Sequence, residues 1–202
     1  MMQAARCDSS MTLEMIGEAH PMRHQVEQYI TARYSSAFDA RIEQFMPQFL
    51  ALLQGRGIQS ICGYRAASEA HLFLEQYLDC AAEQAVSEAF AQHIDRTTLI
   101  EFGQLASFSK GISPFHFYLI AQRLVEMGYQ WCICTVTDPL YALMKRLGLK
   151  PVVIAQADAQ RVSNASQWGS YYQLRPRIVA GDLQQSLTHL KRYWLTKGIC
   201  TE

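Results

Sequence analysis

One stretch of the chain, residues 101–107, places an acidic side chain, a glycine and an amide side chain on a segment typical of a β-strand. Gly103 inside this strand indicates a bulge or a close approach of another group to the backbone. Glu101 could accept a proton from an amine, directly or through water, provided that burial raises its pKa. It could equally form a structural ion pair with Arg65 or Arg96, and the sequence favours neither role.

The end of this strand and the loop after it could bind a carbonyl oxygen and an anion. A bulged strand that splays from a parallel neighbour leaves backbone N–H groups free to bind a carbonyl oxygen, and we expect this at Leu105, Ala106 and Ser107. The next loop leads to Ser113-Pro114, a typical helix start, so its amides and the helix dipole could hold a diphosphate. The alternative is an ordinary turn. The predicted binding residues of the loop are Lys110, Gly111, Ile112 and Ser113.

Aromatic residues far apart in the sequence could line a pocket. Trp168, Tyr171 and Tyr172 could form the wall of an acyl or acceptor pocket, or a packed hairpin at the edge of a sheet. On the first predicted helix, Arg33 and Phe38 share an apolar stripe, where Arg33 could face inward as a binding group or extend to the surface. Further apolar side chains could line a pocket for a long apolar chain: Phe115, Phe117, Met127 and Met144.

The composition argues against several classes of function. Eighteen basic and eighteen acidic residues give no bulk attraction to nucleic acid or to an anionic membrane. No segment approaches the roughly 20 apolar residues of a spanning helix, and the N-terminus lacks the apolar region of a signal peptide. The six cysteines form no Cys-x-x-Cys pair, and no histidine has ligand spacing to Cys132 and Cys134. We therefore expect a cytoplasmic protein with core thiols, no metal and no stable membrane insertion.

The first half of the chain predicts an antiparallel hairpin behind an amphipathic helix. Residues 1–19 are expected to form a flexible leader, and residues 20–202 a single domain. A helix starts after Pro21, and the pattern continues with a short helical piece over residues 41–46. Strands over 49–54 and 58–67 flank a Gly-x-Gly turn. Residues 72–78 are ambiguous between strand and helix, and residues 81–94 are expected to be helical.

The second half predicts alternating strands and helices. Strands are expected over residues 98–107, 129–137 and 149–157, with helices from Ser113 to about residue 128 and over 138–147. Such alternation favours parallel pairing with right-handed crossovers, joined to the antiparallel front half in one mixed sheet. A last helix is expected over about residues 183–195.

Several motifs together resemble the thermostable hemolysin family over about residues 26–181. They are Arg33-Tyr34 with Phe38, Phe45-Met-Pro-x-Phe-Leu50, Gly63-Tyr-Arg65, Phe73-Leu-Glu-Gln-Tyr-Leu-Asp79, Glu101-x-Gly-x-Leu-Ala-Ser107 and Trp168-Gly-Ser-Tyr-Tyr172. The layout of the chain is in turn similar to that of acyl-homoserine-lactone synthases and, more distantly, of Gcn5-related N-acetyltransferases.

This resemblance implies an α/β (α+β) domain of the acyl-CoA N-acyltransferase-like fold, with a mixed, largely antiparallel central sheet, a splayed parallel pair and flanking helices. It implies an acyl donor on a phosphopantetheine arm, either acyl-CoA or acyl carrier protein, with no permanently bound cofactor, and an amine-bearing small acceptor. Glu101 and Gln104 would be catalytic, although most members of the hemolysin family have Asn at the latter position. Acetyltransferases often have a Tyr that protonates the departing thiolate. This chain has Met144 at that position, so Tyr141, one turn earlier, becomes the candidate general acid.

Two other functions stay open at this point. The name of the family suggests direct membrane lysis, but no long cationic amphipathic helix is visible in the sequence. A non-catalytic acyl-binding module would need the same pocket without turnover. The substrate-binding residues that the resemblance suggests are Arg33, Phe38, Trp168, Tyr171 and Tyr172.

Overall fold

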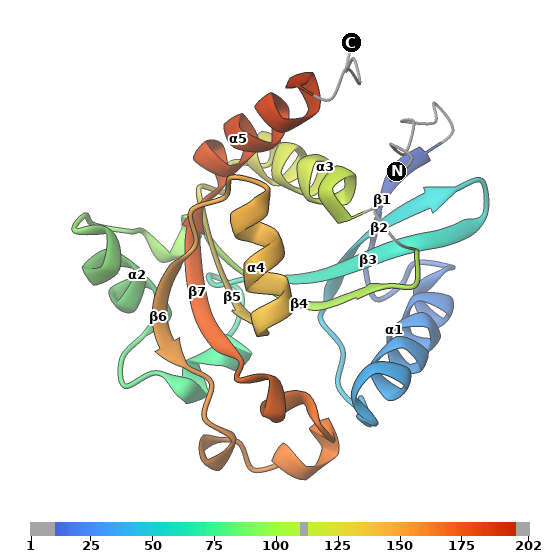
Figure 1. Ribbon diagram of the computed structural model, residues 1–202, viewed down its shortest axis with the longest axis horizontal. Helices are drawn as coiled ribbons and strands as arrows, with labels where there is room; N and C mark the ends of the chain where they lie inside the picture. The colour runs from blue at the N-terminus through green and yellow to red at the C-terminus, as the bar shows by residue number, and fades with distance from the viewer. Residues whose placement is uncertain (1–10, 110–112, 197–202) are drawn as a thin grey trace.

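The computed structural model describes residues 11–109 and 113–196, and within them one sheet has seven strands in the order β1-β2-β3-β4-β5-β7-β6 (Figure 1). All neighbouring strands are antiparallel except β4 and β5, which are parallel. This arrangement confirms the mixed, largely antiparallel sheet with one parallel pair. The strands are β1 Met11–Ile16, β2 Gln48–Gln54, β3 Gly57–Ala66, β4 Leu99–Ser107, β5 Trp131–Val136, β6 Val152–Gln156 and β7 Arg177–Asp182.

Helices cover both faces of the sheet. The helix α1 packs on one face, where Val26 and Ile30 contact a core that includes Phe49 of β2 and Ile61 of β3. The helices α3 and α5 lie side by side on the opposite face (Figure 1). Because side chains alternate along a strand, each face of β2–β4 has its own apolar core. The helices are α1 Arg23–Phe38, α2 Ala82–Phe90, α3 Ser113–Glu126, α4 Asp138–Arg146 and α5 Leu183–Thr196.

The front of the sheet corrects two predictions. Residues 11–16 form the edge strand β1, paired with β2 from Met11 opposite Gln54 to Ile16 opposite Phe49, so the leader predicted over residues 1–19 is wrong for these residues. Residues 1–10 lie outside the described part of the chain. Residues 39–47 form an irregular loop instead of the short helix predicted over 41–46. Contacts with β4 hold this loop, and helical periodicity cannot reveal them.

The back of the sheet corrects the predicted run of parallel strands. The strand β7, which the sequence pattern did not suggest, inserts between β5 and β6 and pairs antiparallel with both. Its centre, Ile178, Val179 and Ala180, is almost fully buried. The strands β5 and β6 are therefore not neighbours, and the single parallel pair is β4–β5.

Short 3₁₀-helices connect the larger elements. The ambiguous segment 72–78 contains η1 Phe73–Tyr77, and η2 Arg96–Thr98 leads directly into β4. The helix expected over 81–94 is the shorter α2. The aromatic segment lies in η4 Ala165–Trp168 and η5 Tyr171–Leu174, which follow η3 Ala159–Arg161. It is therefore not a hairpin at the sheet edge.

Candidate functional site

The site is built where the two parallel strands separate. Pairing between β4 and β5 ends at Phe102 and Cys134, although β4 continues to Ser107 and β5 to Val136. The predicted splay of the parallel pair is therefore present. A cavity of about 740 Å³ lies there, and it is lined by residues of both strands beyond the last pair, among them Leu105.

A bulge in β4 shapes the wall of this cavity. Gly103 and Ala106 of β4 pair with Gly63 and Ile61 of β3, so β4 has one residue more between these two pairs than β3 has. The extra residue is accommodated at Gln104, whose φ of 51° lies in the left-handed region. The bulge that Gly103 suggested is thus confirmed, although the unusual conformation falls on its neighbour.

The side chain of Gln104 holds the loop formed by residues 39–47. Its Oε1 accepts a hydrogen bond from the backbone N–H of Met46 at 2.9 Å, and its Nε2 donates one to the carbonyl oxygen of Gln44 at 2.7 Å. A Cβ on Gly103 would overlap the end of the Met46 side chain, so the glycine lets this loop lie close to β4. Both ends of the Gln104 amide are therefore engaged by the loop, and its catalytic role stays a prediction.

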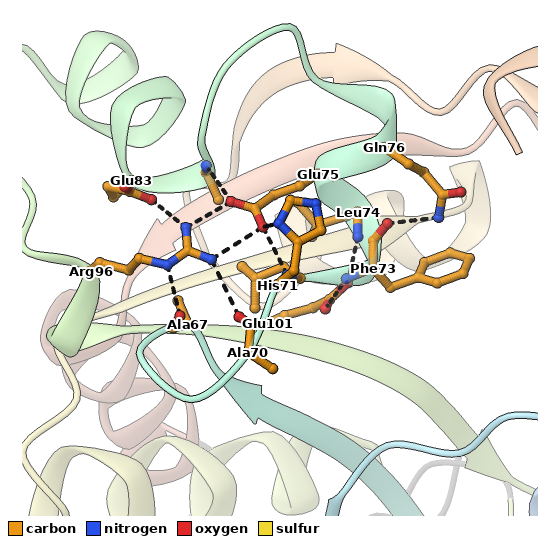
Figure 2. A network of polar contacts seen from close by, with 12 residues as sticks. Ala67, Ala70, His71, Phe73, Leu74, Glu75, Gln76, Glu83, Arg96 and Glu101 are labelled. Atoms are coloured by element: carbon orange, nitrogen blue, oxygen red, sulfur yellow. Dashed lines mark hydrogen bonds and ion pairs between the residues drawn. The ribbon is translucent and has the colours of Figure 1, made fainter.

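Glu101 lies in the cavity wall and is 3 % exposed. Its two carboxylate oxygens accept hydrogen bonds from the backbone N–H groups of Phe73, at 2.8 Å, and Leu74, at 3.0 Å (Figure 2). Burial raises the pKa of this carboxyl, while the two hydrogen bonds and the charge of Arg65 lower it, and the result is a pKa of about 7. Such a value suits a group that exchanges protons near neutral pH.

The structure also tests the predicted ion pair of Glu101. Arg65 lies opposite Glu101 in the register of β3 and β4, yet no ion pair joins the two, and Arg96 pairs with Glu75 and Glu83 instead. Backbone N–H groups, which no sequence pattern displays, are the hydrogen-bond partners of Glu101 in the described residues.

Seven of the other predicted site residues also meet at this cavity. Its lining includes Arg33, Phe38, Gln104, Leu105, Trp168, Tyr171 and Tyr172. Ala106 and Ser107 do not line it: Ala106 pairs with β3, and the Ser107 carbonyl accepts a hydrogen bond from Nε of Arg33 at 2.8 Å. Ser113 begins α3, whereas Lys110, Gly111 and Ile112 lie outside the described residues.

Tyr141 does not reach the cavity. Its ring packs beneath the Arg177 guanidinium, 4.8 Å from ring centre to Cζ, and that guanidinium also pairs with Asp138. Met144 of the same helix lines the cavity instead. The structure therefore does not bring the predicted acid together with Glu101.

Sequence reasoning missed Tyr77, which lines the cavity together with the predicted Tyr172. The hydroxyls of Tyr77 and Tyr172 are 2.6 Å apart, and burial followed by this hydrogen bond raises the pKa of Tyr77. Both residues belong to motifs of the family resemblance, which was the available signal. Their contact depends on η1 and η5, which lie 95 residues apart at this point.

The cavity has two chemically different parts, on opposite faces of the sheet. Glu101 and Phe102 are neighbours on β4, so they point to opposite faces, and both line it. On the face of Glu101 the walls are aromatic, with Tyr171 contacting Phe38 and Trp168. On the other face α3, α4, α5 and β5 contribute apolar side chains, namely Phe117, Ile120, Cys134, Leu140, Leu143, Met144 and Leu190.

Two of the four side chains proposed to surround an acyl chain lie in the apolar part of the cavity. Phe117 and Met144 line the cavity. Phe115 packs against Trp194, and Met127 is exposed at the surface, so neither belongs to it. Within residues 11–109 and 113–196, no three His, Cys, Asp or Glu residues cluster as a metal site. In the same residues no helix has the length and apolar character needed to cross a membrane.

Comparisons with solved structures support the same fold. The chain matches a CoA-dependent acyl-homoserine lactone synthase, MesI, with a TM-score of 0.61 and 11 % identity over 95 % of this chain and 97 % of that one. It matches FeeM, an N-acyl amino acid synthase from uncultured soil microbes, with a TM-score of 0.62 and 12 % identity over 89 % and 94 %. The corresponding values for the synthase LasI are 0.58 and 12 %, over 89 % and 95 %. At such identities the similarity shows the fold.

The comparison of sequences gives the family. No curated protein matches the chain. The family profile described as Thermostable hemolysin matches residues 16–187, which includes nearly every element that lines the cavity. The chain therefore belongs to the thermostable hemolysin family and has the acyltransferase-like fold of the acyl-homoserine lactone synthases.

Proposed function

We propose that this protein is an acyltransferase that moves an acyl group from acyl-CoA or acyl carrier protein to the amine of a small acceptor. One observation carries the proposal: a buried carboxylate with a pKa of about 7, Glu101, lies in the wall of a cavity opened by the splay of β4 and β5. The fold, shared with synthases that make N-acyl products, supports it.

Glu101 would act as the general base. An amine nitrogen attacks the thioester carbonyl carbon, and the ionised carboxylate takes a proton from that nitrogen. The tetrahedral intermediate then collapses, the carbon–sulfur bond breaks, and the proton reaches the departing sulfur. The products are an N-acyl amide and the free thiol, and no group on the protein is consumed.

The two parts of the cavity suggest where the substrates bind. The apolar part between β5, α3, α4 and α5 suits a medium or long acyl chain, because it offers aliphatic and aromatic contacts without a charged side chain among those named above. The aromatic part, which contains Glu101, would hold the acceptor. Arg33, Phe38, Trp168, Tyr171 and Tyr172 line it.

The charges in the aromatic part favour an acceptor that carries a carboxylate. Arg65 lines the cavity beside Glu101, and its guanidinium forms no ion pair among the described residues, only a hydrogen bond to the His71 carbonyl oxygen at 3.2 Å. A guanidinium with free N–H groups binds a carboxylate well. An amino acid could thus place its carboxylate at Arg65 and its amine at Glu101, and the likeness in fold to FeeM, an N-acyl amino acid synthase, supports this class of acceptor.

The test is release of free thiol from an acyl-CoA series, and from an acylated carrier protein, in the presence of amino acids. We expect turnover with medium or long chains, and its loss in Glu101→Gln, which keeps the shape of the side chain. Each amino acid is compared with its carboxamide, and Arg65→Gln should abolish the preference for the carboxylate. Absence of both thiol release and donor binding across the series would refute the proposal, and binding without turnover would indicate an acyl-binding module.

A further inference from the structure

The carboxylate of Glu101 is held by one very short element. The N–H groups that it accepts from belong to Phe73 and Leu74, the first two residues of η1. A 3₁₀-helix of five residues has poor internal hydrogen bonds and little stability of its own. Contacts from outside η1 must therefore fix the direction in which these N–H groups point.

The side chain of Glu75, a residue of η1, receives the first of these contacts. Its carboxylate is 3 % exposed and accepts hydrogen bonds from the backbone N–H groups of Leu72, at 2.8 Å, and Ala82, at 2.9 Å. It thereby joins the start of η1 to the start of α2 (Figure 2). Burial raises the pKa of Glu75, but the hydrogen bonds from Arg96, Ala82 and Leu72 outweigh it and lower the pKa to about 2. Glu75 is therefore ionised wherever Glu101 titrates.

Arg96 supplies the second contact. Its guanidinium binds both oxygens of Glu75, with Nη1 at 2.7 Å and Nη2 at 3.1 Å, in the paired geometry that only arginine offers. Its Nε donates to the carbonyl oxygen of Ala67 at 2.7 Å, which anchors it to the end of β3. Arg96 also begins η2, which leads into β4 and so to Glu101. The clamp and the carboxylate therefore share one stretch of backbone.

We infer that Glu75 and Arg96 are positioning residues for Glu101, because together they fix η1 so that its first two N–H groups hold the Glu101 carboxylate in the cavity wall. Neither side chain is among those that line the cavity, so both act through the backbone of η1. The inference rests on the proposed role of Glu101 as base, but its geometry exists without any substrate.

The consequence of a loosened clamp is a change in how Glu101 titrates. Hydrogen bonds to an ionised carboxylate favour the charged form, whereas burial favours the neutral form. If η1 moves away while Glu101 stays buried, the first effect is lost and the second remains. The pKa of Glu101 then rises, and the pH at which it can accept a proton rises with it.

The test follows the carboxyl carbon of Glu101 by NMR through a pH titration of the protein without substrates. In Arg96→Lys, which keeps the charge but loses the paired geometry, we expect the pKa of Glu101 to rise by about one unit, as for the loss of one hydrogen bond to a charged group. In Glu75→Gln the rise should be smaller, because the charge of Glu75 itself raises the pKa of Glu101 and is removed in this variant. The matched control is Glu83→Gln, because Glu83 binds the same guanidinium but makes no hydrogen bond with η1. Folded variants with an unchanged Glu101 pKa would overturn the inference.

A second measurement uses the wild-type protein, so it tests the inference even if neither the Arg96→Lys nor the Glu75→Gln variant folds. One clamp that holds the start of η1 and of α2 should make the amides of Leu72, Phe73, Leu74 and Ala82 exchange with solvent hydrogen as a unit, with one protection factor. Independent exchange of the Phe73 and Leu74 amides would contradict the inference. Because neither experiment uses a donor or acceptor, their outcome is separate from whether acyl transfer is found.

Discussion

At the residue scale, Glu101 is distinguished by its surroundings more than by its type. A carboxyl group in an apolar wall would be neutral far above neutral pH, and a carboxyl group with two N–H donors in water would be ionised well below it. Both conditions hold for Glu101, and its pKa of about 7 is the balance between them. The group can therefore take up and release a proton under ordinary conditions.

The proposed role of Glu101 predicts a specific pH dependence. Below pH 7 the carboxyl is increasingly protonated, so kcat/KM should fall about tenfold for each pH unit. Glu101→Gln should lower kcat by about 10²–10⁴-fold and remove this limb. Two acceptors with different amine pKa values distinguish Glu101 from the acceptor amine as the titrating group. The pH at which the rate falls shifts with the amine pKa if the acceptor sets it, and stays the same if Glu101 sets it. A limb that always follows the acceptor would argue against the base.

At the element scale, the site depends on contacts between segments that are remote in the sequence. Backbone hydrogen bonds hold the aromatic segment to the end of α1 and to the loop after it, from Ser170 N to the Phe38 carbonyl at 2.7 Å and from Arg41 N to the Gln167 carbonyl at 2.6 Å. Gly169, between η4 and η5, has a φ of 54°, and a Cβ there would overlap the Phe38 and Asp39 carbonyl oxygens. This glycine lets the aromatic wall close against α1.

Gly169→Ala should therefore destabilise the protein by about 3 kcal/mol or more, because the strained φ is combined with a backbone clash. Gly128→Ala is the matched control: its φ is 93°, but a Cβ there meets nothing within 4 Å, so only the conformational cost of about 1–2 kcal/mol applies. Urea unfolding of the two variants measures the difference. Equal losses would show that the contact with α1 is not tight.

The helix α4 should set the length of the acyl chain. Met144 lines the apolar part of the cavity, so Met144→Trp should fill it and shift kcat/KM across the acyl-CoA series toward shorter chains. Tyr141→Phe, one turn earlier, should leave the series unchanged, because Tyr141 packs beneath Arg177 outside the cavity. An effect of Tyr141→Phe on kcat alone would instead restore its role as an acid.

At the scale of the whole molecule, two buried titrating groups have opposite effects on stability. His116 is fully buried between the Ser60 hydroxyl, 2.8 Å from Nδ1, and the Leu50 carbonyl, to which Nε2 donates at 3.1 Å; burial lowers its pKa to about 4. His116 binds a proton more readily in the unfolded chain than in the folded one. Its contribution to the stability of the fold is therefore complete above pH 6.5 and is lost as the pH falls to 4. Glu101 has the opposite effect. Because its pKa is raised in the folded chain, its contribution to stability is complete below pH 4.5 and is lost as the pH rises to 7.

Between pH 4.5 and 6.5 the contribution of His116 to the free energy of unfolding rises with pH and that of Glu101 falls. Their sum should therefore be nearly constant over this interval. In Glu101→Gln only the His116 term remains, so stability should rise across that interval by about 2–3 kcal/mol. Urea unfolding at several pH values, for the wild type and this variant, measures the two curves. Parallel curves would show that Glu101 has the same pKa in the folded and unfolded chain.

The sequence predicted what depends on neighbours along the chain. The hairpin of β2 and β3, the start of α3 at Ser113 and the bulge near Gly103 all follow from local rules. It did not predict β7 between β5 and β6, because a short strand directly before a helix has no periodicity that sets its place in the sheet. The N–H donors of Glu101, the loop held by Gln104 and the packing of Tyr141 against Arg177 are contacts across the fold, and residue type does not encode them.

Glu101 and Phe102 line one cavity from opposite faces of the sheet, and this arrangement has a kinetic consequence. If acyl donor and acceptor occupy the two faces, both can be bound at once, and the acyl group can pass directly between them. The thiols that line the same cavity, Cys62, Cys132 and Cys134, have pKa values raised by burial, to about 12 for Cys62 and for Cys132, so they stay protonated and are poor acyl carriers. Initial-rate plots should therefore show intersecting lines, as for a ternary complex, and iodoacetamide should leave the rate unchanged.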